Sequence, residues 1–206
     1  MRILAHMARE KKIPSVLEAF LDIDKRHHEV NYLITDYDPF SEHIRDETLQ
    51  ITEYGRANIA YKMEAARKTA LVMGYDGIFN VEDDNVVPKD ALLKLIETEK
   101  DLICGVYRYR PSRKPHTPLM PEKRYNRSNF DDSDLDKGTL EAFLIPWGCT
   151  LFKRPVLETV PFTQGLDGAY CGKCRDKEIK RWVCMDVHVG HIDVAPDGSM
   201  VEIKVL

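Results

Sequence analysis

Short apolar runs alternate with helical apolar stripes along the first half of the chain. Four of the apolar runs are typical of buried strands, at 2–5, 30–35, 77–81 and 101–107. Apolar residues spaced three and four apart predict helices between them, at 13–23, 57–73 and 88–96. This alternation predicts βαβ units, and so an α/β, Rossmann-like fold with a mostly parallel central sheet flanked by helices. Such sheets bind ligands beyond the carboxyl ends of their strands.

The pattern changes after residue 107. Residues 108–127 carry seven Lys or Arg and four prolines, and four aspartates follow between 131 and 136. The stretch 108–138 therefore predicts a polar, mobile loop rather than a packed element. Strand-like and helical patterns return over 139–206, with a short helix from Pro155 and another over 167–177. We expect one domain over 1–206, with halves 1–107 and 139–206 on either side of the loop.

Composition narrows the class of protein. The chain of 206 residues has a formal net charge of -4, which argues against a globally basic nucleic-acid binder and leaves a local basic patch open. No apolar run approaches the ~20 residues that span a bilayer, and the N-terminal stretch turns charged too early for a signal peptide. Five cysteines, an odd number, fit reduced thiols in a cytoplasmic protein.

Three consecutive acids, Glu82, Asp83 and Asp84, follow the apolar run at 77–81. Carboxylate oxygens at the ligand-binding edge of a sheet suit Mg²⁺ or Mn²⁺. Alternatively, the acids form a solvated turn before the helix that begins near Pro88, because acids favour helix N-termini. The chain has no G-x-G-x-x-G or Walker loop, which argues against dinucleotide oxidoreductases and P-loop enzymes.

Four segments carry a family resemblance, in a fixed order along the chain. They are RANIAYKMEAARKTALVMGYDG, GYDGIFNVEDDNVVPKDALLKLI, FLIPWGCTLFKRPVLE and DGAYCGKCRDKEIKRWVCMDVHVGHI. Together they resemble GT-A fold glycosyltransferases, in particular small family-2-like enzymes that use nucleotide sugars. In that family an apolar strand ends in a D-x-D motif, and later segments line the acceptor site and close with a Gly-His pair. The resemblance implies a GT-A fold with a smaller, acceptor-side sheet.

The resemblance assigns a metal site and a catalytic base. Asp84 matches the metal ligand of D-x-D, and His191 matches the Gly-His position that completes metal or pyrophosphate binding. His188 is a second candidate, and each histidine could instead be satisfied by hydrogen bonds at a strand end. Asp167 matches the catalytic carboxylate, which would deprotonate the acceptor and give inversion at the anomeric carbon. Asp167 could equally cap a helix.

The resemblance also implies contacts with the two substrates. The residues that it assigns to the nucleotide sugar are His6, Asp36, Arg56, Asn58, Glu82 and Asp83. The position of Glu82 usually holds an Asp that contacts the ribose, and Asp36 could equally form a turn and Arg56 lie on the surface. Trp147 and Gly148 match an acceptor-binding segment, although the Trp147 indole could equally anchor the core.

The resemblance implies a transferase that uses Mn²⁺ or Mg²⁺ and moves a sugar from a nucleoside diphosphate sugar to a hydroxyl-bearing acceptor. The acceptor could be a glycan, a lipid-linked sugar or a protein, and homo-oligomerisation is left open. A sugar-phosphate nucleotidyltransferase and an inactive nucleotide-sugar-binding scaffold are the alternatives. Cys171 and Cys174 form a C-x-x-C that could hold zinc, but a structural zinc site needs four converging ligands.

Overall fold

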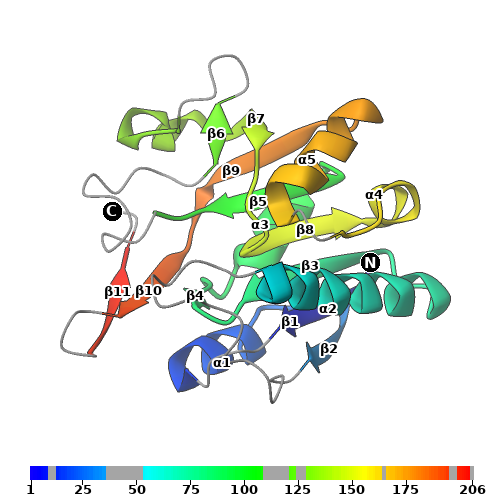
Figure 1. Ribbon diagram of the computed structural model, residues 1–206. Helices are drawn as coiled ribbons and strands as arrows, with labels where there is room; N and C mark the ends of the chain where they lie inside the picture. The colour runs from blue at the N-terminus through cyan, green and yellow to red at the C-terminus, as the bar shows by residue number, and fades with distance from the viewer. Residues whose placement is uncertain are drawn as a thin grey trace.

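The computed structural model describes residues 1–8, 13–35, 53–108, 121–123, 129–163, 166–194 and 199–204. Asp36 and most of the predicted loop lie outside these residues. The helices of the described chain are α1 (Pro14–Leu21), α2 (Glu53–Val72), α3 (Ala91–Glu97), α4 (Arg154–Thr159), α5 (Leu166–Asp176) and the 3-10 helix η2 (Asp132–Lys137). Figure 1 shows them arranged around a central sheet.

Eight strands form the central sheet, in the order β2-β1-β3-β8-β5-β9-β7-β6. Their bounds are β1 Arg2–Ala8, β2 Glu29–Thr35, β3 Gly77–Glu82, β5 Leu102–Val106, β6 Glu122–Lys123, β7 Thr139–Leu144, β8 Cys149–Lys153 and β9 Arg181–His188. Strands β2, β1 and β3 are parallel neighbours, as are β5 and β9, while β8 lies antiparallel between β3 and β5. The sheet is therefore mixed rather than mostly parallel: β1, β2 and β3 are parallel as the βαβ pattern predicted, while the parallel partner of β5 is β9, from the second half of the chain.

Three further strands form a small sheet in the order β11-β10-β4, with bounds β4 Asn85–Val86, β10 Gly190–Val194 and β11 Met200–Ile203. Strand β4 follows directly after β3, and β10 follows directly after β9. The small sheet therefore lies next to the ends of these two central strands (Figure 1). The α/β class, with a large central sheet, flanking helices and a smaller sheet, is confirmed.

Two apolar clusters fill the two faces of the central sheet. One packs β-strand residues against α2, α4 and α5, and the other packs them against α1 and α3. Alternation along each strand assigns its residues to the two faces. In β1, for example, Leu4 belongs to the first cluster while Ile3, Ala5 and Met7 belong to the second. Helices thus cover both faces and leave the strand ends for the site.

The end of the predicted loop differs from expectation, because residues 132–137 form η2 and pack against the sheet. Asp131 and Asp134 form a reciprocal capping box at its start. The buried Asp134 carboxylate pairs with Lys123 and Lys137, each at 2.7 Å. Burial opposes ionisation of Asp134, but these hydrogen bonds outweigh it and hold its pKa at about 2. The aspartate-rich pattern therefore builds a packed turn.

Candidate functional site

The acidic turn lies where β3 ends and β4 begins, at the carboxyl edge of the parallel strands. Asp84 is 5% exposed and Asp83 is 8% exposed, which is unusual for carboxylates. The Asn85 Nδ2 lies 3.2 Å from the Asp84 Oδ1 and 3.4 Å from the Glu82 Oε2, so one amide connects the two acids. The buried Asp84 carboxylate, held this close to the partly buried Glu82, favours a nearby cation.

His191 lies opposite Asn85 in the pairing of β10 with β4, which brings its ring to the acidic turn. Its Nε2 is 3.8 Å from the Asp84 Oδ1, and its Nδ1 is 2.7 Å from the Arg108 carbonyl oxygen. Because a carbonyl only accepts, Nδ1 donates, and in the neutral form of the ring the Nε2 lone pair lies on the side of Asp84. Metal-binding histidines use this arrangement, in which a backbone carbonyl fixes the tautomer. The runner-up, His188, is exposed at the end of β9.

Tyr107, directly after β5, is a central residue that the sequence analysis did not single out. Its hydroxyl accepts the Gly148 N–H at 3.2 Å, and its ring packs edge-on against His191 at a centroid distance of 5.3 Å. Burial raises the pKa of Tyr107 well above its usual value, and the charges of Glu82 and Asp167 raise it further. Both acids therefore lie within electrostatic reach of one phenol. An aromatic at the carboxyl end of a strand was the signal available in the sequence.

Gly148 fits the site because its backbone comes close to two side chains. A Cβ at this position would lie 2.3 Å from the Tyr107 hydroxyl oxygen and 2.7 Å from the Asn85 Nδ2. The Gly148 carbonyl also accepts the Glu82 N–H at 3.0 Å, which ties the start of β8 to the end of β3. Glycine at 148 is thus required by the close approach of Tyr107 and Asn85, and its contact with an acceptor stays a prediction.

Trp147 takes the alternative role, that of a core anchor. Its side chain is 2% exposed and packs edge-on against Phe162 and Tyr170, at centroid distances of 5.1 and 5.8 Å. No open indole face is left for a sugar to stack on, so the expectation that Trp147 lines the acceptor site is not supported. Large aromatic area stabilises most when it is buried, and the cluster between the sheet and α5 supplies that environment.

Asp167 lies in the first turn of α5 and is partly buried. Burial raises the pKa of its carboxyl above the usual value, and a hydrogen bond from its own backbone opposes this. A raised pKa moves a carboxylate towards the range useful for a general base. The charge of Asp167, like that of Glu82, raises the pKa of Tyr107, so both acids lie near the Tyr107 phenol. The catalytic role of Asp167 stays a prediction.

His6 lies within the sheet, and each of its ring nitrogens forms a hydrogen bond with another side chain. Its Nδ1 is 2.7 Å from the Asn80 Oδ1, and its Nε2 is 3.0 Å from the Thr35 Oγ1. Asn80 in turn donates to the Trp147 carbonyl at 2.8 Å. Burial lowers the pKa of His6 to about 4, so the ring is neutral at pH 7. The His6 side chain joins β1, β2 and β3 beneath the site, and its contact with a nucleotide stays a prediction.

The remaining predicted residues lie on the helices α2 and α5. Arg56 is exposed and Asn58 partly buried in the first turns of α2. Cys171 and Cys174 face the apolar cluster under α5, and the Cys171 thiol lies 3.6 Å from the Ile145 carbonyl oxygen. Within the described part of the chain, no group of three or more His, Cys, Asp or Glu side chains is placed to hold a metal ion. The zinc hypothesis for Cys171 and Cys174 therefore gains no support from the described residues.

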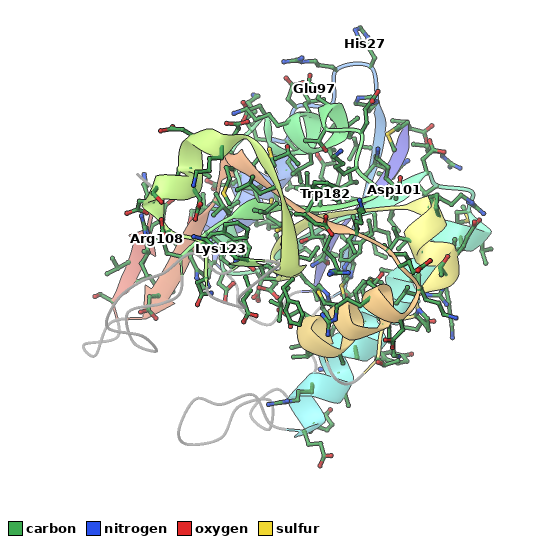
Figure 2. All side chains as sticks on the ribbon, turned by 90° about the horizontal axis from the view of Figure 1, so that it is seen from above. His27, Glu97, Asp101, Arg108, Lys123 and Trp182 are labelled. Atoms are coloured by element: carbon green, nitrogen blue, oxygen red, sulfur yellow. The ribbon has the colours of Figure 1, made fainter. Side chains whose placement is uncertain are left out.

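A groove of about 420 Å³ lies away from the acidic turn. It is lined by residues of α4 and by residues that precede or begin β5 and β9, among them Asp101 and Trp182, which Figure 2 labels near each other. Lys100 and Lys180 lie over the Trp182 ring, at 4.3 and 5.9 Å from its centroid. This groove is at the amino ends of the strands, whereas ligands of such sheets bind at the carboxyl ends. We therefore place the candidate site at the acidic turn.

Comparison with known proteins establishes the fold. No family model and no curated protein matches the chain. A197 from STIV is 15% identical, with a TM-score of 0.60, over 98% of this chain and 94% of that chain. S. aureus TarS 1–349 is 16% identical, with a TM-score of 0.52, over 90% of this chain and 58% of that chain. TarS 1–349 in complex with UDP-GlcNAc is 15% identical, with a TM-score of 0.53, over 90% and 56% of the two chains.

Identities this low show a shared fold and nothing finer. The chain spans just over half the length of the TarS fragment that it matches. In the part of the chain that the structure describes, no helix is long and apolar enough to cross a membrane. This chain thus has the α/β architecture expected from the resemblance. TarS 1–349 in complex with UDP-GlcNAc shares this architecture.

Proposed function

We propose that this protein is a metal-dependent glycosyltransferase that moves a sugar from a nucleoside diphosphate sugar to an acceptor hydroxyl. The observation that carries the proposal is the pair of Asp84 and His191, both almost fully buried, 3.8 Å apart and at the carboxyl edge of the sheet. The similarity in fold to TarS in complex with UDP-GlcNAc supports the choice of a nucleotide sugar as the ligand.

The side chains present fit a divalent metal ion. An octahedral ion with donors at about 2.1 Å places two neighbouring donors about 3.0 Å apart, so the Asp84 Oδ1 and the His191 Nε2, now 3.8 Å apart, would approach each other by about 0.8 Å to bind one ion. A carboxylate oxygen with a neutral imidazole suits Mn²⁺ or Mg²⁺, with Mn²⁺ the better match for the nitrogen. Such an ion, when bound, neutralises charge that develops on a leaving diphosphate.

The protein groups then have separate tasks. Asp84 and His191 would hold the ion, and Asn85 keeps the Asp84 and Glu82 carboxylates in place through its amide. Asp167 would accept the proton of the acceptor hydroxyl while that oxygen bonds to the anomeric carbon and the bond from this carbon to the diphosphate oxygen breaks. Attack from the face opposite the leaving group inverts the anomeric carbon. Retention would remove the role of Asp167 as a base.

Donor binding is tested first by thermal unfolding with UDP-, GDP-, ADP- and CDP-sugars, each with Mn²⁺, Mg²⁺ or EDTA. A ligand at about 100 times its Kd adds about 2.7 kcal/mol to the free energy of unfolding, which raises the melting temperature measurably. We expect a metal-dependent rise with one nucleotide, lost in Asp84→Asn and kept in the matched control Asp186→Asn, whose side chain is exposed on β9. No rise with any nucleotide would refute the donor site.

Catalysis is tested separately with Asp167→Asn. If Asp167 is the base, this variant binds the donor as the wild type does and loses transfer. Donor binding without transfer in the wild type, over a range of acceptors, would instead favour a binding protein. Unchanged transfer by Asp167→Asn would leave the proposed activity standing and require another base.

A further inference from the structure

Strand β9 contains more residues than the part of β5 that it pairs with. Cys104 of β5 lies opposite Val183. Val106, two residues further along β5, lies opposite His188, which is five residues further along β9. The extra residues of β9 form a bulge, and pairing resumes beyond it, where the Val189 N–H donates to the Val106 carbonyl at 2.9 Å. A bulge bends its strand and changes the direction of the residues that follow.

Contacts with three other parts of the molecule hold this bulge. The Met185 N–H donates to the Gly138 carbonyl, just before β7, at 2.9 Å. The Lys94 ammonium of α3 donates to the Asp186 carbonyl at 3.1 Å. Val187 is fully buried in the apolar cluster on the α1 and α3 side of the sheet. The bulge is therefore a built part of the fold, with partners for its backbone and a buried side chain.

Gly105, between the two paired residues of β5, makes room for the bulge. A Cβ at this position would lie 2.8 Å from the Val187 Cγ1, 3.0 Å from the Val187 carbonyl oxygen and 3.1 Å from the Val189 Cγ2. Ordinary contact begins at 3.4 Å, so an alanine would displace Val187 by about 0.6 Å. Both valines are fully buried in a packed cluster, which leaves displacement away from β5 as the response. Glycine at 105 thus allows β9 to lie this close to β5.

The bulge leads directly to the candidate metal site. His191, the second residue of β10, follows two residues after Val189. Its Nδ1 lies 2.7 Å from the carbonyl oxygen of Arg108, which continues the chain just beyond β5, and its Nε2 lies 3.8 Å from the Asp84 Oδ1. A displacement of Val189 away from β5 therefore moves His191 relative to both Arg108 and Asp84.

We propose that Gly105 is a positioning residue of the metal site, which acts on the bound ion through His191. The inference rests on the proposed function and extends it to a residue that contacts neither the ion nor a substrate. The absence of a side chain at 105 lets the bulge of β9 close against β5, and the closed bulge sets the position of His191 opposite Asp84. Neighbouring donors of an octahedral ion lie about 3.0 Å apart, so a displacement of His191 by a fraction of an ångström away from Asp84 opposes binding.

The test compares two glycine variants with similar crowding. Gly105→Ala is the test variant. In the matched control, Gly77→Ala, the new Cβ would lie 2.7 Å from the Phe152 carbonyl oxygen, at the first residue of β3 and so at the opposite end of that strand from the acidic turn. Calorimetric titration of the full chain with Mn²⁺, with folding checked by circular dichroism, measures the affinity. We expect Gly105→Ala to weaken Mn²⁺ binding about tenfold or more, and Gly77→Ala to leave it within about a factor of two.

A second variant approaches the same contact from β9. Val187→Leu lengthens the side chain that faces Gly105, so it should also weaken Mn²⁺ binding while residue 105 is unchanged. If Gly105→Ala does not fold, Val187→Leu takes its place in every comparison.

NMR of the histidine ring N–H groups gives a readout that needs no metal. The His191 Nδ1–H signal, assigned by its absence in His191→Gln, reports the hydrogen bond to the Arg108 carbonyl. This signal should shift or disappear in Gly105→Ala and stay unchanged in Gly77→Ala. A purely structural role of Gly105 would lower the melting temperature and move neither this signal nor the Mn²⁺ affinity.

Two results would overturn the role of Gly105. One is wild-type Mn²⁺ affinity in both Gly105→Ala and Val187→Leu. The other is an equal loss of affinity in Gly77→Ala, which would make the effect one of general destabilisation. If the wild type binds no Mn²⁺, the proposed metal site fails and the NMR signal alone decides. A signal changed in Gly105→Ala and not in Gly77→Ala then supports the positioning of His191 by Gly105, and any other result overturns it.

Discussion

Gly148→Ala tests the close packing at the centre of the candidate site. The new Cβ would lie 2.3 Å from the Tyr107 hydroxyl oxygen and 2.7 Å from the Asn85 Nδ2. Ordinary van der Waals contact begins at 3.4 Å, so Tyr107 and the backbone of residue 148 must separate by about 1 Å. Tyr107 is fully buried and packs on the ring of His191, so its shift displaces the histidine that faces Asp84.

The expected cost combines two effects. Overpacking of a buried site costs about 1–3 kcal/mol. Separation also stretches the hydrogen bond from the Gly148 N–H to the Tyr107 hydroxyl, and a buried donor without its acceptor costs about 1–3 kcal/mol more. The free energy of unfolding should therefore fall by about 2–6 kcal/mol. At about 2–4 °C per kcal/mol for a chain of this length, the melting temperature should fall by about 4–24 °C.

Thermal unfolding followed by circular dichroism measures this change. The matched control is Gly168→Ala, where no atom lies within 4 Å of the new Cβ and the residue is helical. Alanine favours a helix over glycine by up to about 1 kcal/mol, so the control should unfold at or slightly above the wild-type temperature. Gly148→Ala with Tyr107→Phe should lose less stability than the sum of the two single changes. A wild-type melting temperature for Gly148→Ala would refute the packing described.

Three more predictions concern stability and reactivity. His6 has a pKa of about 4 when folded against 6.5 in the unfolded chain, so it contributes about 3 kcal/mol above pH 6.5 that is lost as the pH falls to 4. Urea unfolding of His6→Gln between pH 7 and pH 4 should show a smaller loss than the wild type, and equal losses would contradict this. All five cysteines are buried, and burial raises the pKa of Cys149 to about 12. A thiol reagent should thus react slowly with the native protein and rapidly in denaturant, and fast native reaction would contradict the burial. Asp134→Asn should lower the free energy of unfolding by about 1–3 kcal/mol, because it removes the charge that Lys123 and Lys137 neutralise. The exposed Asp136→Asn serves as its control, and equal stability of the two variants would refute the role of Asp134.

The parallel part of the sheet was predictable because its signal is local. Apolar runs and helical periodicities in the first half specify β1, β2, β3 and β5 directly. The place of β8 was not predictable, since β8 follows β5 in the chain by more than forty residues and still inserts between β3 and β5. Such pairing depends on long-range packing that leaves no periodic trace in the sequence. The chain therefore predicts the class of fold better than the order of its strands.

The same distinction applies to the site. Asp84 was predictable because an acid that ends a buried strand in an α/β fold lies at the ligand edge. Tyr107 and Asn80 could not be assigned, because their roles depend on partners far along the chain: Gly148 for the hydroxyl and His6 for the amide. η2 was missed for a related reason, since Asp134 pairs with Lys123 as well as with its neighbour Lys137. Ion pairs across the fold turned a loop-like composition into a packed turn.

The meeting of Asp84 and His191 depends on the register of the small sheet. His191 is opposite Asn85, and the Ile192 N–H donates to the Asp84 carbonyl at 2.8 Å. A slip of β10 by one residue would turn His191 to the other face and replace it with a neighbour. Arg108 opposes such a slip at a second point. Its carbonyl accepts a hydrogen bond from His191, and its guanidinium pairs with Asp132 at the start of η2. Figure 2 places Arg108 next to Lys123 on this side of the molecule. The aspartate-rich segment that reads as a loop thus supports, through Arg108, the histidine on which the proposed metal site depends.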